Sequence, residues 1–218
     1  MSARALRAAL LAAALLGGAA AMAADDAATR PARVDHVADL LVTMLPMGEI
    51  FDETAAKDPR WPLGDKAAKL PEDKLKCMRG ELSSDGFRRQ RVVEVREYYR
   101  NVSDDQLAND LRVLDGGAAV LLRKFMQAGF EAKRSGKPVD QAKAMEGATG
   151  AQMASMVEFV QSPDFKGLRK LSGLGDSFSG NRSATESEDA GKSAGASLVT
   201  KFMFKAMDTC SVPPASLL

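Results

Sequence analysis

A serine in a Gly-Asp-Ser sequence and a single histidine are the residues of this chain best suited to hydrolysis. Ser177 follows Gly175 and Asp176. A serine nucleophile needs a base within hydrogen-bonding distance to take its proton. His36 is the sole histidine and lies far upstream of Ser177. The sequence therefore does not support a serine hydrolase, and it identifies no catalytic residue.

The candidates for phosphate or metal binding are equally weak. Residues 191–193 read Gly-Lys-Ser, like the end of a phosphate-binding loop, but Glu186 stands where its first glycine should be. Glu188 and Asp189 would repel phosphate, and with Glu186 they could at most hold a cation weakly. Zinc needs several cysteines or histidines, and the chain has two Cys and one His. No cofactor and no metal site is predicted.

Three pairs of methionines have spacings that place two thioethers on one helix face, an arrangement that can bind Cu(I). The same spacings are typical of residues that pack in a helical core, which is our preferred interpretation. Copper handling, or hydrolysis at a site that no motif reveals, is the alternative function. The pairs are Met44 and Met47, Met153 and Met156, and Met203 and Met207.

Arginines make the segment 87–100 basic, although Glu94 and Glu97 are interleaved with them. We interpret this segment as a solvated helix face rather than a site for an anionic partner. The whole chain has 30 Lys and Arg against 29 Asp and Glu, so no nucleic-acid partner is expected. The arginines are Arg88, Arg89, Arg91, Arg96 and Arg100.

The first 23 residues have the order of a secretory signal peptide. Arg4 and Arg7 precede a short apolar run, and the small-x-small sequence of residues 21–23 follows. The apolar run is too short to span a bilayer. We expect cleavage after Ala23, a periplasmic or secreted mature chain from Ala24, and no transmembrane segment in that chain.

Cys77 and Cys210 are the only cysteines. An even pair in an exported chain predicts one disulfide, with an intermolecular bridge and two free thiols as the alternatives. The bridge would join the tail of the chain to a helix in its first half.

Helical periodicity dominates the rest of the chain, with breaks at Pro46, in the loop 57–65 and at Gly116-Gly117. Ser103 and Gln106 form a capping-box pattern that predicts a helix start at residue 104. The Gly- and Ser-rich stretch 172–197 is predicted to be a flexible loop. The expected helices cover about residues 34–44, 47–56, 71–82, 87–100, 104–115, 138–161, 163–171 and 198–207, and an apolar stretch covers residues 118–130.

A shift of 46 residues aligns two parts of the chain. Gln106 then falls on Gln152, and Leu122-Arg123-Lys124 falls on Leu168-Arg169-Lys170. Each part reads as a helix, a two-residue break and a second helix. The pattern predicts two related helical hairpins around one core, with chance similarity between amphipathic helices as the alternative.

The break in the second hairpin carries a family resemblance. Residues 159–168 resemble an exported bacterial helical domain of unknown function, whose hallmark is a helix ending in two aromatics, one residue, Ser-Pro, Gly and Lys. Val160 replaces the second aromatic, and Phe165 stands where the glycine would be. The resemblance covers about residues 100–172 and implies a helical fold and export, but no activity. The matching residues are Phe159, Ser162, Pro163 and Lys166.

These observations predict an all-α bundle of seven or eight helices, a single domain over residues 24–218 that one disulfide closes. The predicted function is that of an exported, non-enzymatic protein that binds an unidentified protein or apolar ligand. We expect the binding surface to be an apolar groove between the two hairpins, near Phe125, Phe159 and Phe165.

Overall fold

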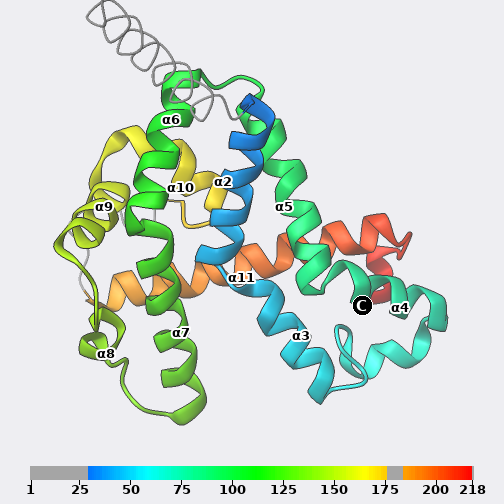
Figure 1. The fold of residues 1–218 in the computed structure, drawn as a ribbon. Coiled ribbons are helices and arrows are strands. Elements are labelled where there is room, and N and C mark those ends of the chain that lie inside the picture. The colour runs from blue at the N-terminus through cyan, green and yellow to red at the C-terminus, as the bar shows by residue number, and fades with distance from the viewer. Residues whose placement is uncertain (1–28, 176–183, 218) are drawn as a thin grey trace, which may run out of the picture.

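The computed structural model of the protein describes residues 29–175 and 184–217. Within these ranges the chain forms ten α-helices and no strand, which confirms the all-α bundle with more helices than predicted. The predicted signal peptide and Ser177 lie outside the described ranges. The α-helices are α2 Arg30–Met44, α3 Met47–Lys57, α4 Glu72–Glu81, α5 Ser84–Tyr99, α6 Asp104–Val113, α7 Ala119–Ser135, α8 Gln141–Met145, α9 Gly150–Gln161, α10 Lys166–Ser172 and α11 Ala184–Thr209 (Figure 1).

Helix α2 lies at the centre of the bundle. Its apolar residues recur every three or four positions, so they form one stripe that packs against α5, α6 and α7. Val37, Leu41 and Met44 are fully buried there. Two polar contacts hold α2 beside α6 and the break that follows it. Arg30 forms an ion pair with Asp104, and the His36 ring lies 2.9 Å from a carboxylate oxygen of Asp115 in the break.

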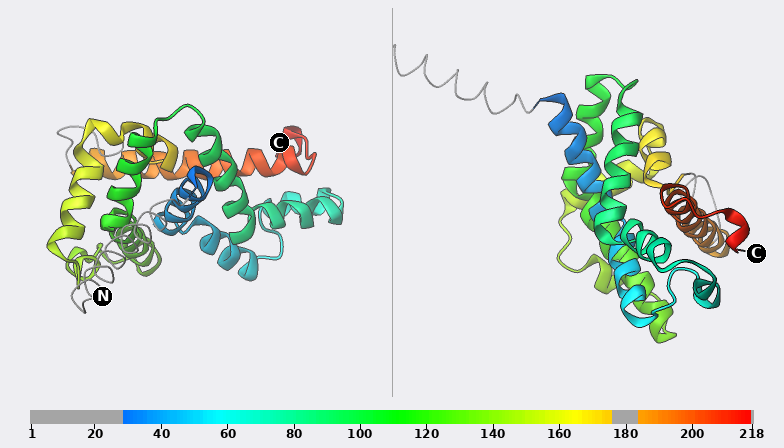
Figure 2. Two further views of the ribbon diagram at one scale, coloured as in Figure 1. Left: turned by 45° about the horizontal axis from the view of Figure 1, so that its top comes forward. Right: turned by 90° about the vertical axis from the view of Figure 1, so that its right-hand side faces the viewer.

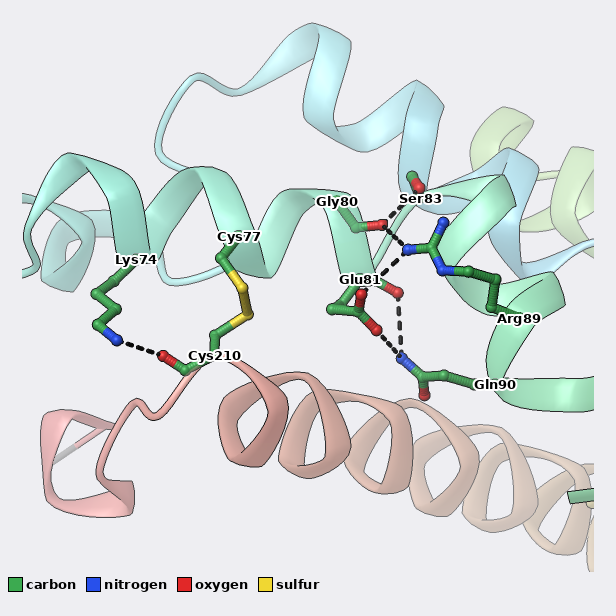
Figure 3. The surroundings of a disulfide bond; sticks show 8 residues. All are labelled: Lys74, Cys77, Gly80, Glu81, Ser83, Arg89, Gln90 and Cys210. Atoms are coloured by element: carbon green, nitrogen blue, oxygen red, sulfur yellow. Dashed lines mark hydrogen bonds and ion pairs between the residues drawn. A yellow bond between two sulfur atoms is a disulfide. The ribbon is translucent and has the colours of Figure 1, made fainter. Parts of the chain in front are cut away.

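Helix α11 crosses one side of this group of helices, as the two views of Figure 2 show. The disulfide between Cys77 of α4 and Cys210, just after α11, is present as predicted (Figure 3). Lys74 Nζ adds a 2.9 Å hydrogen bond to the carbonyl oxygen of Cys210. None of the helices that the structure describes is both long enough and apolar enough to cross a membrane.

The prediction of a loop over residues 172–197 is wrong from residue 184 onward. Helix α11 begins at Ala184, not near residue 198 as predicted. The segment contains alanine, glutamate and lysine, and their helix propensity outweighs that of the interspersed glycines and serines. Ser193 and the residues 195–197 are exposed on the helix surface. Residues 176–183 of the predicted loop lie outside the described ranges.

The prediction of a single helix over residues 138–161 is also wrong. The chain forms the short helix α8, turns at Gly147 with a φ of +70°, and starts α9 at Gly150. A positive φ ends a helix because residues with a Cβ rarely adopt it. Thr149 and Gln152 then form a complete capping box at the start of α9. This cap was not predicted. At Ser103 the predicted helix start at residue 104 is confirmed, and the Ser103 hydroxyl accepts from the backbone N–H of Gln106 at 3.2 Å.

The two predicted hairpins correspond to two helix–break–helix units, in each of which the two helices follow one another with little contact between them. The first consists of α6, a π-helical break at Leu114–Ala118, and α7. The second consists of α9, a 3-10 break at Pro163–Phe165, and α10. Ser103 and Thr149, which are 46 residues apart, both cap the first helix of their unit. The predicted helix–break–helix order is therefore confirmed in both units.

Candidate interaction surface

Two of the three predicted groove residues belong to the hydrophobic core. Phe159 and Phe165 have no exposed surface, so the predicted groove cannot include them. Arg169 holds the backbone at this break, because its Nη1 donates to the carbonyl oxygens of Phe159 at 2.6 Å and Ser162 at 2.8 Å. These two hydrogen bonds hold the break between α9 and α10 against the core. Phe125 is half-buried on α7.

Two pockets among the described residues lie away from the predicted groove. One of about 440 Å³ sits where α7 ends and is lined by charged residues that include Arg134, Lys137 and Asp140. Another of about 480 Å³ lies at the end of α11, beside the exposed side chain of Phe204 and Pro213. Neither pocket includes His36 or a predicted groove residue.

His36 has a partner far along the chain, which the sequence does not predict. It contacts Asp115, and both side chains are about half exposed. Because the pair joins α2 to the break after α6, it serves to position α2. Among the residues that the structure describes, no group of three or more His, Cys, Asp or Glu is arranged to hold a metal ion. Met44 and Met47 are buried in the core, which supports a packing role for that pair.

The basic helix α5 presents no row of unpaired arginines. Each predicted arginine contacts a carboxylate, so the positive charge of this face is locally neutralised. Arg91 differs from the prediction because it is completely buried rather than solvated. The pairs are Arg88 with Asp39, Arg89 with Glu81, Arg91 with Glu94, Arg96 with Asp35, and Arg100 with Glu97.

A buried carboxylate lies where α5 meets α6. Asp110 accepts hydrogen bonds from Tyr99 Oη at 2.6 Å and from Gln106 Nε2 at 2.8 Å, and it has no exposed surface. Burial raises the pKa of Asp110, and the two hydrogen bonds oppose that change. Gln106, expected to reach back to Ser103, donates instead to Asp110 and to the carbonyl oxygen of Asp164. The cluster therefore ties α6 to α5 and to the second hairpin.

The raised pKa of Asp110 predicts a pH-dependent stability. The native state binds the proton more tightly than the unfolded state, so the stabilisation from Asp110 is complete below about pH 4 and is lost as pH rises through the raised pKa. As pH rises through the raised pKa, the unfolding free energy of the wild type should fall relative to that of an Asp110→Asn variant, by at most about 1.4 kcal/mol per pH unit. Urea unfolding of both proteins between about pH 4 and pH 7 measures the difference.

Exposed carboxylates such as Asp35, whose pKa Arg96 lowers through a hydrogen bond, act in the opposite direction. These carboxylates are the same in the wild type and the Asp110→Asn variant, so their contributions to the unfolding free energy cancel in the comparison. A difference in unfolding free energy that does not change with pH would show that Asp110 does not titrate in this way.

Helix α9 leaves part of its apolar surface exposed. Seven of its twelve residues are apolar and only Glu158 is charged, yet Phe159 is its one fully buried residue. Met153 is 36% exposed and Val157 is 46% exposed. Together with exposed Gly150 and Ala154 they form one stripe at i, i+3, i+4 and i+7, here named the α9 face.

Such a face normally packs against another element, and contiguous exposed apolar surface typically marks an interaction site. Sequence periodicity alone could not find it, because both sides of α9 are apolar and the sequence does not say which side is covered. The covered side faces the break after α6, where Gly117, with a φ of +123°, lets the Gln152 side chain approach its backbone.

Comparisons with protein-family models, with curated proteins and with solved structures found no match. The resemblance to the exported bacterial helical domain therefore stays a prediction.

Proposed function

We propose that this chain is an exported, non-enzymatic protein that acts by binding another protein through the α9 face. The observation that carries the proposal is the exposure of Met153 and Val157 on an almost uncharged helix. Burying such side chains against a partner stabilises a complex by roughly 25 cal/mol per Å² of apolar surface, before the costs of association. The face is a stripe on a helix surface, and none of its residues lines either of the two pockets described above, which favours a protein partner over a small apolar ligand.

Export to an oxidising compartment is supported by two features. Residues 1–23 have the order of a signal peptide. The Cys77–Cys210 disulfide is a kind of bond that persists in the periplasm and outside the cell.

A photo-crosslinking residue placed at Val157 in the native host tests the proposal. It should give covalent adducts of discrete mass. Val93 on α5 is the matched control, because it is 56% exposed and is also a helix-surface valine. The same probe at Val93 should give no adduct. Equal adducts from both positions, or none from Val157, would contradict a binding role for the α9 face.

A further inference from the structure

Met153 is the one exposed methionine among those that the structure describes, with 36% of its surface accessible. The other methionines of the described ranges serve in packing, since each of them is buried or half-buried. The buried ones are Met44, Met47, Met78 and Met207, and the half-buried ones are Met126, Met145, Met156 and Met203. Met153 is therefore the described methionine that a reagent in solution reaches most easily.

The neighbours of Met153 on the α9 face are small. A side chain on a helix leans towards the preceding turn, which for Met153 is the turn that holds Gly150. The space where a side chain of residue 150 would lie is open, because a Cβ built there would have no neighbouring side chain within 4 Å. Ala154, the next residue of the stripe, ends at its Cβ and is itself exposed. These small neighbours leave the thioether of Met153 accessible from solvent.

A peroxide oxidises an accessible thioether without help from a catalytic group. The sulfur lone pair attacks one peroxide oxygen and the O–O bond breaks. The hydroxide that leaves takes the proton from the sulfur-bound oxygen and departs as water, so the sulfur is oxidised to the sulfoxide and the peroxide is reduced. A reductase that uses a dithiol returns the sulfoxide to the thioether, releases its oxygen as water and converts the dithiol to a disulfide. Oxidation of a methionine to this level is therefore reversible.

We propose that Met153 is a selective and reversible oxidation site, and that its sulfoxide switches off binding at the α9 face. The second half of this inference rests on the proposed function. Oxidation places a polar S=O group within the apolar stripe that runs from Gly150 to Val157. A partner that covers the stripe has to remove water from that oxygen, so binding should weaken at least about tenfold. The fold should not change, because Phe159 on the buried side still holds α9 in the core.

Limited treatment of the mature chain with hydrogen peroxide tests the oxidation site. Trypsin releases residues 144–166 as one peptide, which carries Met145, Met153 and Met156. Fragment-ion mass spectrometry of this peptide gives the three oxidation rates under identical conditions. In the folded protein Met153 should react several times faster than its half-buried neighbours, and in urea all three should react at the same rate. Equal rates in the folded protein, or a faster reaction at another methionine, would overturn the site.

Crosslinking from position 157 in the native host, before and after peroxide treatment, tests the switch. The fraction of adduct that survives peroxide should fall at least about tenfold in the wild-type background and in the control Met156→Leu. In Met153→Leu, which has an apolar side chain but no sulfur, this fraction should not fall. Adducts that persist in the oxidised wild type would overturn the switch. An equal loss in Met153→Leu would do the same, because peroxide would then act elsewhere.

These results differ from a failure of the proposed function. Adducts that form at position 157 and are insensitive to peroxide would refute the switch and leave the binding role of the α9 face intact. Absence of every adduct before oxidation would refute both the binding role and the switch, while the rates measured on the purified protein would still decide whether Met153 is the oxidation site.

Discussion

Replacing Cys77 and Cys210 with alanine is expected to lower the free energy of unfolding by about 3–5 kcal/mol. The disulfide closes a loop of 133 residues, so its loss frees a large part of the unfolded chain. It also removes the covalent bond between α4 and the end of α11, two elements that pack against each other. Urea unfolding followed by circular dichroism measures the change.

Reduction of the wild type supplies the matched control for the disulfide. Fully reduced wild-type protein should unfold at the same urea concentration as the double alanine variant, apart from the small packing contribution of the two thiols. A loss below about 1 kcal/mol in both samples would mean that the loop-closure argument fails for this fold.

Replacing Arg91 with methionine is expected to destabilise the protein by about 3–5 kcal/mol, because it breaks a buried charged network by removing one partner. The guanidinium donates to the carbonyl oxygens of Leu171 and Ser172, both at 2.9 Å, and so caps the end of α10. It also lies 5.4 Å from the ring centre of Phe87 and 5.2 Å from that of Phe202. Methionine fills a similar space but leaves both carbonyls without a donor.

Arg100→Met is the control for Arg91→Met. Arg100 belongs to the same basic segment, but its pair with Glu97 is more than two-thirds exposed, where ion pairs contribute little. The Arg100→Met substitution should change the unfolding free energy by less than about 0.5 kcal/mol. Similar losses of unfolding free energy for the two variants would indicate that Arg91 does not hold α5, α10 and α11 together.

Local signals in the sequence predicted the helical parts of the fold well. Pro46 separates the first two helices, Ser103 caps α6, and the Ser162-Pro163 break divides α9 from α10, because each of these effects involves only neighbouring residues. The disulfide was predictable because there were only two cysteines to pair. The first half of α11 was not predicted, because the glycines and serines of the stretch 172–197 were taken as helix-breaking although alanine, glutamate and lysine lie among them.

The binding surface could not be predicted because it depends on which helix faces are covered. Phe159 and Val157 are both apolar and two positions apart, and only the packing of α9 on the first hairpin buries one and exposes the other. Long-range polar partners were equally hidden. Nothing local in the sequence connects Arg91 with residues 171 and 172, or His36 with Asp115.

Genetic complementation tests the central claim most directly, namely that the chain acts by binding through α9 and not by catalysis. In a strain that lacks the gene, Val93→Glu, Ser177→Ala and His36→Ala should each restore the wild-type phenotype, whereas Val157→Glu should not. Equal helical content and equal abundance of all four proteins must be verified by circular dichroism and immunoblotting. If Ser177→Ala failed to complement while Val157→Glu succeeded, the protein would act through chemistry at the serine, and the binding function proposed for α9 would be wrong.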